Sequence, residues 1–107
     1  MKTEELNKII TDNDAVLVYF SGESCGVCKA LAPKIEQEIK AYYPKIKQVY
    51  ISATDFQETA TSYSVFTIPT VIVFFDSKEF NRKSRHISVA GFIEELKRPY
   101  NLFFDNH

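Results

Sequence analysis

The feature of this chain that most constrains its fold is an apolar run that stops at a short turn and gives way to a helical pattern beginning at a cysteine. Residues 16–20 are all aliphatic or aromatic, which is typical of a buried strand, and Ser21 and Gly22 break that run. Cys25 and Cys28 follow, and they are the only cysteines in the chain. The sequence therefore predicts a strand, a turn and a helix whose first turn carries both thiols.

The placement of these two cysteines predicts redox chemistry. The first turn of a helix presents unpaired N–H groups and the positive end of the helix dipole, so it stabilises a thiolate. Thiol pKa values in Cys-x-x-Cys motifs fall to roughly 3.5–7.5. Because residues three apart share a helix face, Cys28 can attack the sulfur of Cys25 and close a small disulfide. We expect one thiol to be the nucleophile and the other to resolve the intermediate.

Strand and helix patterns alternate along the rest of the chain, which predicts an α/β fold with helices on both faces of a sheet. Thr54 and Gln57 predict a capping box at the start of the third helix. Helical spacing places Tyr42 on the buried face of the second helix. The expected strands cover residues 15–20, 46–52, 70–75 and 82–89, and the expected helices cover 3–11, 25–43, 54–63 and 91–104.

The composition, with 45% hydrophobic and 25% charged residues, is that of a globular protein. A length of 107 residues suits a single domain spanning 1–107. The formal net charge of -1 gives no indication of a nucleic-acid partner or an anionic membrane surface. Because the chain has neither a long apolar run nor a secretory signal pattern, we expect a cytoplasmic protein with no membrane partner.

A metal site and inert packing are the alternatives to redox chemistry for the cysteine pair. Structural zinc usually takes four ligands, and His86 and His107 are the histidines that could complete such a site. Both lie far from the cysteines in the sequence, so a zinc site would be one shared across a dimer. We therefore expect no metal and regard both histidines as surface residues. Two cysteines at this spacing in such a chain favour a redox motif.

The cysteine motif, taken together with two prolines, resembles the thioredoxin family. Cys25-Gly26-Val27-Cys28 is followed by Pro33 within the same predicted helix, and Ile68-Pro69-Thr70 precedes an apolar strand. The resemblance covers nearly the whole chain and implies a thioredoxin-like fold. The family's first strand has no counterpart here. We therefore expect a four-stranded mixed sheet with residues 46–52 at one edge.

The resemblance also implies a function, that of a thiol–disulfide oxidoreductase acting on protein disulfides. Cys25 would attack a substrate disulfide, and Cys28 would then attack Cys25 and release the reduced product. Pro69 corresponds to the family's cis-proline, and Ile68 would pair its backbone with the substrate. The implied partners are disulfide-containing proteins and an NADPH-dependent flavoprotein reductase. The chain itself needs no cofactor, and it contains no glycine-rich phosphate loop.

Several positions around the dithiol depart from the family pattern. Ser24 stands where the family usually has tryptophan, and Val27 stands where it usually has proline. Tyr19 replaces a buried aspartate, and Tyr50 replaces the lysine that pairs with it. Tyr19 is therefore either a packing residue or a phenol near Cys28 that belongs to its proton-transfer environment.

These departures keep a second function open, a thioredoxin-fold binding module or subunit whose dithiol regulates a partner. The direction of electron flow is also open, because the residues between the cysteines influence the reduction potential. The basic run Arg82, Lys83 and Arg85 is interpreted as a solvated edge strand that discourages sheet-to-sheet association, with a docking surface for an acidic partner as the alternative. We expect a monomer with some tendency to dimerise through the edge at 46–52.

Overall fold

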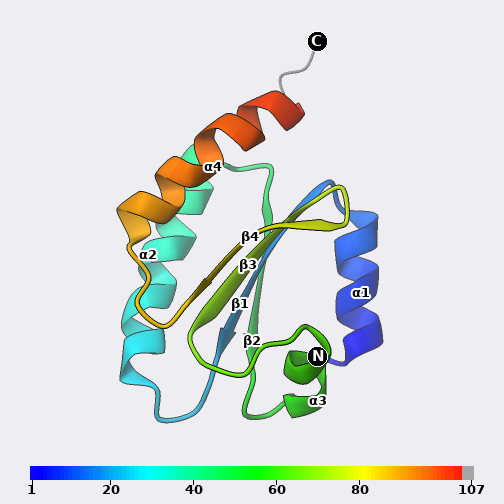
Figure 1. The fold of residues 1–107 in the computed structure, drawn as a ribbon, viewed down its shortest axis with the longest axis vertical. Coiled ribbons are helices and arrows are strands. Elements are labelled where there is room, and N and C mark those ends of the chain that lie inside the picture. Colours follow the sequence, from blue (N-terminus) through cyan, green and yellow to red (C-terminus); the bar gives the residue numbers. More distant parts are fainter. Residues whose placement is uncertain (105–107) are drawn as a thin grey trace.

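The computed structural model describes residues 1–104, which form one mixed sheet between two layers of helices (Figure 1). The four strands have the order β2-β1-β3-β4. β1 runs parallel to β2, whereas β3 is antiparallel to both β1 and β4. The predicted sheet, with β2 at one edge, is confirmed. The strands are β1 (Ala15–Ser21), β2 (Lys47–Ser52), β3 (Thr70–Phe75) and β4 (Lys78–Ser84), and the helices are α1 (Thr3–Asp12), α2 (Gly26–Tyr42), α3 (Gln57–Ser62) and α4 (Val89–Phe104).

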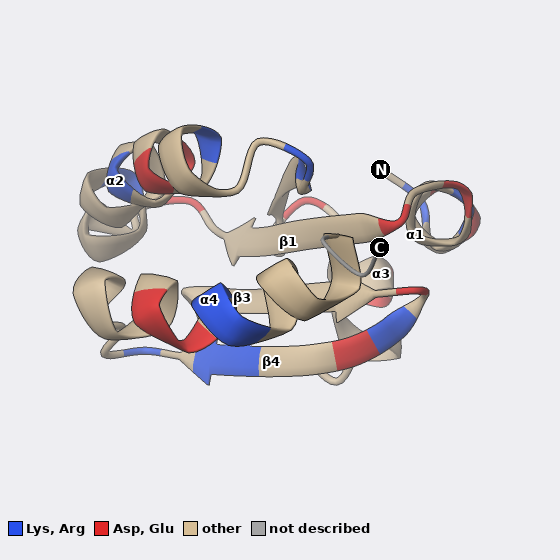
Figure 2. Ribbon diagram, turned by 90° about the horizontal axis from the view of Figure 1, so that it is seen from above, with Lys and Arg blue, Asp and Glu red and all other residues tan. Residues whose placement is uncertain are grey.

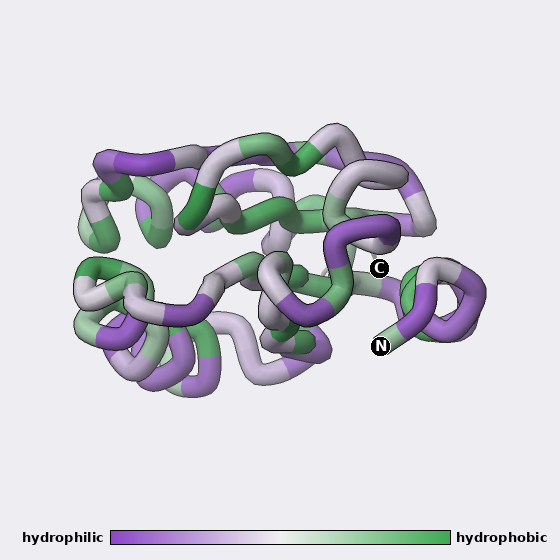
Figure 3. The backbone as a smooth tube through the Cα atoms, turned by 90° about the horizontal axis from the view of Figure 1, so that it is seen from below, coloured by the Kyte–Doolittle hydropathy of each residue, from purple (hydrophilic) through white to green (hydrophobic). Residues whose placement is uncertain are grey.

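β1 separates two hydrophobic cores, because side chains alternate between the faces of a strand. Its odd-numbered residues pack under α2 and α4, and its even-numbered residues pack under α1 and α3. Hydrophobic residues accordingly run along the central strands, while hydrophilic and hydrophobic residues alternate along the helices (Figure 3). The first group is Ala15, Leu17 and Tyr19, and the second is Val16, Val18 and Phe20. This division places Tyr19 on the same side of the sheet as α2.

The end of α2 differs from the prediction. Tyr42 is 61% exposed, whereas the next residue, Tyr43, is 5% exposed and donates a hydrogen bond from its hydroxyl to the carbonyl of Ile93. The helix stops because Pro44 disfavours helical geometry in the residue before it, and Tyr43 takes φ −134°. The turn of the chain there carries the Tyr43 side chain into the core in place of Tyr42.

Two further element boundaries differ from the prediction. α3 begins at Gln57 and has no capping box, because the Gln57 side chain donates to the carbonyl of Thr54 instead. α4 begins at Val89, where the Ser88 hydroxyl accepts a hydrogen bond from the Gly91 amide at 3.2 Å. The buried face of α4 consists of Phe92, Leu96 and Tyr100, with Phe103 and Phe104 partly buried.

The fourth strand lies earlier than residues 82–89, as β4 at Lys78–Ser84. It forms a hairpin with β3 through Asp76 and Ser77, whose φ angles are 53° and 67°. Two positive φ angles are typical of the tight turns that join antiparallel strands, which usually carry glycine. The turn contains no glycine, and β4 is a largely exposed edge strand without apolar alternation, so the sequence pattern was too weak to locate it.

None of the helices within residues 1–104 is long and apolar enough to cross a bilayer.

Candidate active site

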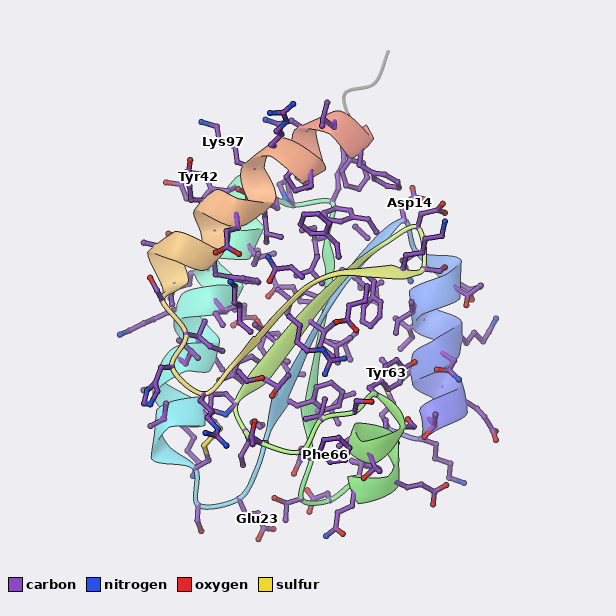
Figure 4. The ribbon with its side chains drawn as sticks, in the orientation of Figure 1. Asp14, Glu23, Tyr42, Tyr63, Phe66 and Lys97 are labelled. Carbon is purple, nitrogen blue, oxygen red and sulfur yellow. A yellow bond between two sulfur atoms is a disulfide. The ribbon has the colours of Figure 1, made fainter. Side chains whose placement is uncertain are left out.

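Four segments meet at one end of the sheet. Phe20 pairs with Thr70, and Thr70 pairs with Ser84, so the end of β1, the start of β3 and the end of β4 are neighbours. Ser21 pairs with Ser52, which adds the end of β2. The disulfide lies on the first turn of α2 at this same end, together with Glu23 and Phe66 (Figure 4). The register of the sheet thus gathers the cysteine motif and the loop of residues 65–69.

Cys25 and Cys28 form a disulfide whose Cα atoms are 5.3 Å apart. Cys25 is the residue that caps α2, and the amide N–H of Cys28 donates to its Sγ at 3.2 Å. Cys25 is partly exposed, whereas Cys28 is 1% exposed. An N–H directed at the sulfur, at the positive end of a helix, is the environment that stabilises a thiolate. One sulfur can therefore be reached from outside, and the other is shielded.

The remaining motif residues leave the surface around the disulfide open. Ser24 is exposed and has a φ of 57°, in the left-handed region. Val27 is 63% exposed, and a Cβ on Gly26 would meet no atom within 4 Å beyond its chain neighbours and the backbone of its own helix. Lys29 is also exposed. None of these side chains covers the disulfide with a bulky aromatic ring.

The loop of residues 65–69 contains the cis peptide bond Ile68–Pro69 that the resemblance implied. Pro69 is buried and Ile68 is half-buried. The Thr70 hydroxyl donates to the carbonyl of Thr67 at 2.7 Å, and the Arg85 amide donates to the carbonyl of Pro69 at 2.8 Å. Backbone groups next to Ile68 are therefore held from β3 and from the residue just beyond β4.

Gly22 is a site residue that the sequence analysis interpreted only as a turn. A Cβ on Gly22 would lie 2.5 Å from Cδ1 of Ile68 and 2.7 Å from Oγ1 of Thr54. The same Thr54 oxygen accepts a hydrogen bond from the amide of Glu23. The turn before the cysteines therefore packs directly against the loop of residues 65–69. This contact joins segments far apart in the sequence, so no local pattern could indicate it.

Tyr19 is fully buried, and its hydroxyl donates to the backbone carbonyl of Cys28 at 2.9 Å. Its ring centroid lies 5.4 Å from that of Tyr50. Burial raises the pKa of Tyr19 to about 12. Burial, followed by the nearby Glu36 and Tyr19, also raises the pKa of Tyr50. The position at which the resemblance implied a buried aspartate therefore holds a neutral phenol whose hydroxyl is hydrogen-bonded to the backbone of the second cysteine.

Two hollows lie on opposite sides of this end of the molecule. One, of about 420 Å³, includes Phe66, which is 77% exposed and which the sequence analysis did not single out. No sequence signal distinguishes an exposed phenylalanine in a loop from a core residue. The other, of about 390 Å³, is lined by Val27, Leu31, Arg85, His86, Ile87 and Ser88. Val27 therefore belongs both to the cysteine motif and to a surface depression.

Potential metal ligands do not gather around the dithiol. Among the described residues, no group of three or more histidine, cysteine, aspartate and glutamate side chains is arranged to hold a metal ion. His86 is exposed, and His107 lies outside the described residues. The cysteines are instead bonded to each other.

Comparison with known proteins agrees with this geometry. The Thioredoxin family model matches residues 1–98. Thioredoxin-like protein YdfQ of Bacillus subtilis (strain 168) is 33% identical over 98 residues, which cover 92% of this chain and 87% of that protein. The sequence likeness therefore extends over nearly the whole chain.

Solved structures show the same relationship. Thioredoxin 1 from Thermosipho africanus TCF52B is 29% identical and superposes with a TM-score of 0.75, covering 86% of this chain and 99% of its own. The thioredoxin of Plasmodium falciparum is 26% identical and superposes with a TM-score of 0.77, covering 88% of this chain and 93% of its own. With the paired cysteines and the match of family and fold, the chain belongs to the thioredoxin family of thiol–disulfide oxidoreductases.

Proposed function

We propose that the protein reduces disulfide bonds in other proteins through Cys25 and Cys28. The observation that carries this proposal is the unequal environment of the two sulfurs. Cys25 caps α2, its sulfur accepts a hydrogen bond from the Cys28 amide, and it is partly exposed. Cys28 is shielded from solvent. A nucleophile needs access and a stabilised thiolate, and a resolving thiol needs only to reach the first sulfur.

The first step starts from the reduced dithiol. The Cys25 thiolate attacks one sulfur of a substrate disulfide, so a mixed disulfide forms while the substrate S–S bond breaks. The departing substrate sulfur leaves as a thiolate and takes a proton from water. The amide of Cys28, which lies 3.2 Å from the Cys25 sulfur in the disulfide form, is placed to stabilise the attacking thiolate.

The second step resolves the mixed disulfide. Cys28 loses its proton and attacks the Cys25 sulfur, and the second substrate sulfur leaves as a thiol. The substrate gains two electrons and two protons, and the protein is left with the Cys25–Cys28 disulfide that the structure contains. Tyr19 takes part through its hydrogen bond to the Cys28 carbonyl, but with a pKa of about 12 it is a poor proton acceptor at neutral pH.

Substrate and recycling partners complete this proposal. The half-buried Ile68, beside Pro69, offers backbone groups for pairing with an extended substrate segment. An NADPH-dependent flavoprotein reductase would return two electrons to the disulfide. We propose that the protein works as a monomer at micromolar concentration in the cytoplasm. β2 remains an edge through which copies could pair weakly, which light scattering would detect.

Reduction of insulin with dithiothreitol as the electron source tests the proposed function. The wild-type protein should accelerate insulin precipitation, and both Cys25→Ser and Cys28→Ser should lose turnover. Cys28→Ser should accumulate mixed disulfides with substrate proteins, whereas Cys25→Ser should not. Preferential alkylation of Cys28 by iodoacetamide at pH 6.5, mapped on peptides, would reverse the assignment of the two thiols.

A second candidate is a regulatory module whose dithiol controls binding to one partner. The phenol of Tyr19 favours it, because the group that could most directly deprotonate Cys28 is absent from that position. A module of this kind would react with iodoacetamide at Cys25 yet reduce insulin no faster than dithiothreitol alone. The insulin assay therefore separates the two functions.

A further inference from the structure

Arg82, on β4, contacts the backbone immediately before the loop of residues 65–69. The Arg82 guanidinium donates to the carbonyl of Tyr63 at 2.8 Å and to the carbonyl of Ser64 at 3.2 Å. On its other side, Glu79 accepts from Nε at 2.9 Å and from Nη2 at 2.8 Å. The guanidinium is thus held by a carboxylate while it holds two backbone carbonyls, which is the planar arrangement that arginine makes and lysine cannot.

The two carbonyls belong to the turn at which the loop begins. α3 ends at Ser62, and Ser64 takes a φ of 58°, so the chain reverses there before it reaches Val65. At the far end of the loop, the Arg85 amide donates to the carbonyl of Pro69. The chain of β4 and the residue just beyond it therefore contact the backbone at both ends of residues 65–69, once through a side chain and once through the main chain.

The neighbouring cation on β4 has a different role. Lys83 pairs with Glu95 at 2.9 Å, which links β4 to α4. Charged residues on β4 and α4 are visible side by side in Figure 2. Two residues of the basic run that was interpreted as a solvated edge therefore contact different parts of the structure. Lys83 joins two surface elements, whereas Arg82 reaches the backbone of the turn before Ile68.

We propose that Arg82, fixed by Glu79, is a positioning residue that sets the loop of residues 65–69, and with it the backbone of Ile68, for pairing with the substrate. This inference rests on the proposed function of the loop. The hydrogen bond with Arg82 lowers the pKa of Glu79, which favours the charged carboxylate that holds the guanidinium. The Arg82 side chain is only 29% exposed. The Tyr63 side chain is held separately, by a hydrogen bond from its hydroxyl to Asn7, so the contact of Arg82 with this turn is with its main-chain carbonyls alone.

Kinetics of paired variants test this role. Arg82→Met keeps an unbranched stem at this position but removes the guanidinium and with it all four N–H···O bonds. Lys83→Met is the matched control, because it removes an adjacent cation and one ion pair without touching the turn. Arg82→Met should lower kcat/KM for insulin on the order of tenfold, mainly through KM, since displacements near 1 Å can cost up to about 10²-fold. Lys83→Met should stay within about twofold of the wild type.

Two further measurements separate positioning from general damage. The rate at which iodoacetamide alkylates reduced Cys25 should be unchanged in Arg82→Met, because that reaction does not use the loop. Hydrogen exchange at the amides of residues 65–68 should accelerate in Arg82→Met and not in Lys83→Met. Glu79→Gln, a milder change, should fall between Arg82→Met and the wild type in both kcat/KM and exchange.

Three results would overturn the inference. The first is equal loss of insulin reduction and Cys25 alkylation in Arg82→Met, which would mean that the whole site has been disturbed. The second is wild-type exchange in the loop of Arg82→Met. The third is full activity in Arg82→Lys, since charge alone would then suffice. If the wild-type protein does not reduce insulin, the proposed function fails, and the exchange data still decide whether Arg82 holds the loop.

Discussion

Gly22 is the residue at which the turn before the cysteines comes closest to the loop of residues 65–69. Gly22→Ala should lower the free energy of unfolding by about 1–3 kcal/mol, because the new methyl group must displace Ile68 and Thr54. It should also slow insulin reduction. Gly26→Ala is the control, since its methyl group would enter open space in the first turn of α2. Urea unfolding of the two variants should show a loss for the first and none for the second.

Tyr19 offers a second test at the level of one residue. Tyr19→Asp should speed the resolution of mixed disulfides above pH 7, because a carboxylate can accept the Cys28 proton where a phenol cannot. It should cost about 3 kcal/mol or more of stability, since the aromatic neighbour Tyr50 provides no cation for the buried charge. Single-turnover reduction of a fluorescent disulfide measures the rate.

Tyr19→Phe is the matched control for this comparison. It keeps the ring and removes the hydrogen bond to the Cys28 carbonyl, so it should cost about 1 kcal/mol and leave the pH dependence of resolution unchanged. If Tyr19→Asp and the wild type resolve at equal rates from pH 6 to pH 9, Tyr19 is only a packing residue.

Residues in the candidate site differ in how far the sequence could indicate them. Cys25 and Cys28 follow from local spacing and Pro69 from the family resemblance, and the structure places all three at one end of the sheet. The contacts of Gly22 and Arg82 could not be predicted, because each depends on a partner from a distant segment. Phe66 gave no signal either, as its exposure is set by the path of the loop around it.

At the level of elements, α4 illustrates how strongly burial decides the effect of a substitution. Leu96 is fully buried, whereas Leu102, on the same helix, is 63% exposed. Leu96→Ala should lower the free energy of unfolding by about 2–5 kcal/mol through lost contacts and a residual cavity. Leu102→Ala should change it by less than about 0.5 kcal/mol. Equal losses in urea unfolding would show that α4 does not dock on the sheet as described.

Elements with strong apolar patterns were predictable, and edges were not. β1 and β3 are buried on both faces, so their continuous apolar runs identified them. β4 carries mostly exposed polar residues, so its pattern could not fix its position. Tyr42 was misplaced because it is the last residue of α2, and the turn imposed by Pro44 buries Tyr43 in its place. In each case the error lies where the local pattern ends and tertiary packing decides.

For the whole molecule, the buried phenols predict how stability responds to alkaline pH. Tyr19 has a pKa of about 12 in the folded protein against an ordinary value of 10.0, so the folded state holds its proton more tightly. The contribution of Tyr19 to the free energy of unfolding is therefore fully present below pH 10 and is lost as the pH rises through 12. The loss should be on the order of 2 kcal/mol by pH 12.

Urea unfolding of the oxidised protein between pH 7 and pH 12 measures this loss. Tyr19→Phe should have a flatter profile than the wild type, because it has no proton to lose at that position. A wild-type profile identical to that of Tyr19→Phe would place the alkaline transition elsewhere in the molecule. Tyr50, whose pKa is also raised, is then the next residue to replace with phenylalanine.

Because the side chains of β1 alternate between the two cores, insertions and deletions within this strand should be poorly tolerated. An insertion or deletion of one residue within β1 would send every following side chain to the opposite face. Tyr19 would then no longer face α2, and the cysteines would be shifted by one residue relative to the loop of residues 65–69. Gains and losses of residues should be tolerated better at the hairpin turn of Asp76 and Ser77, which lies at the other end of β3 from the disulfide.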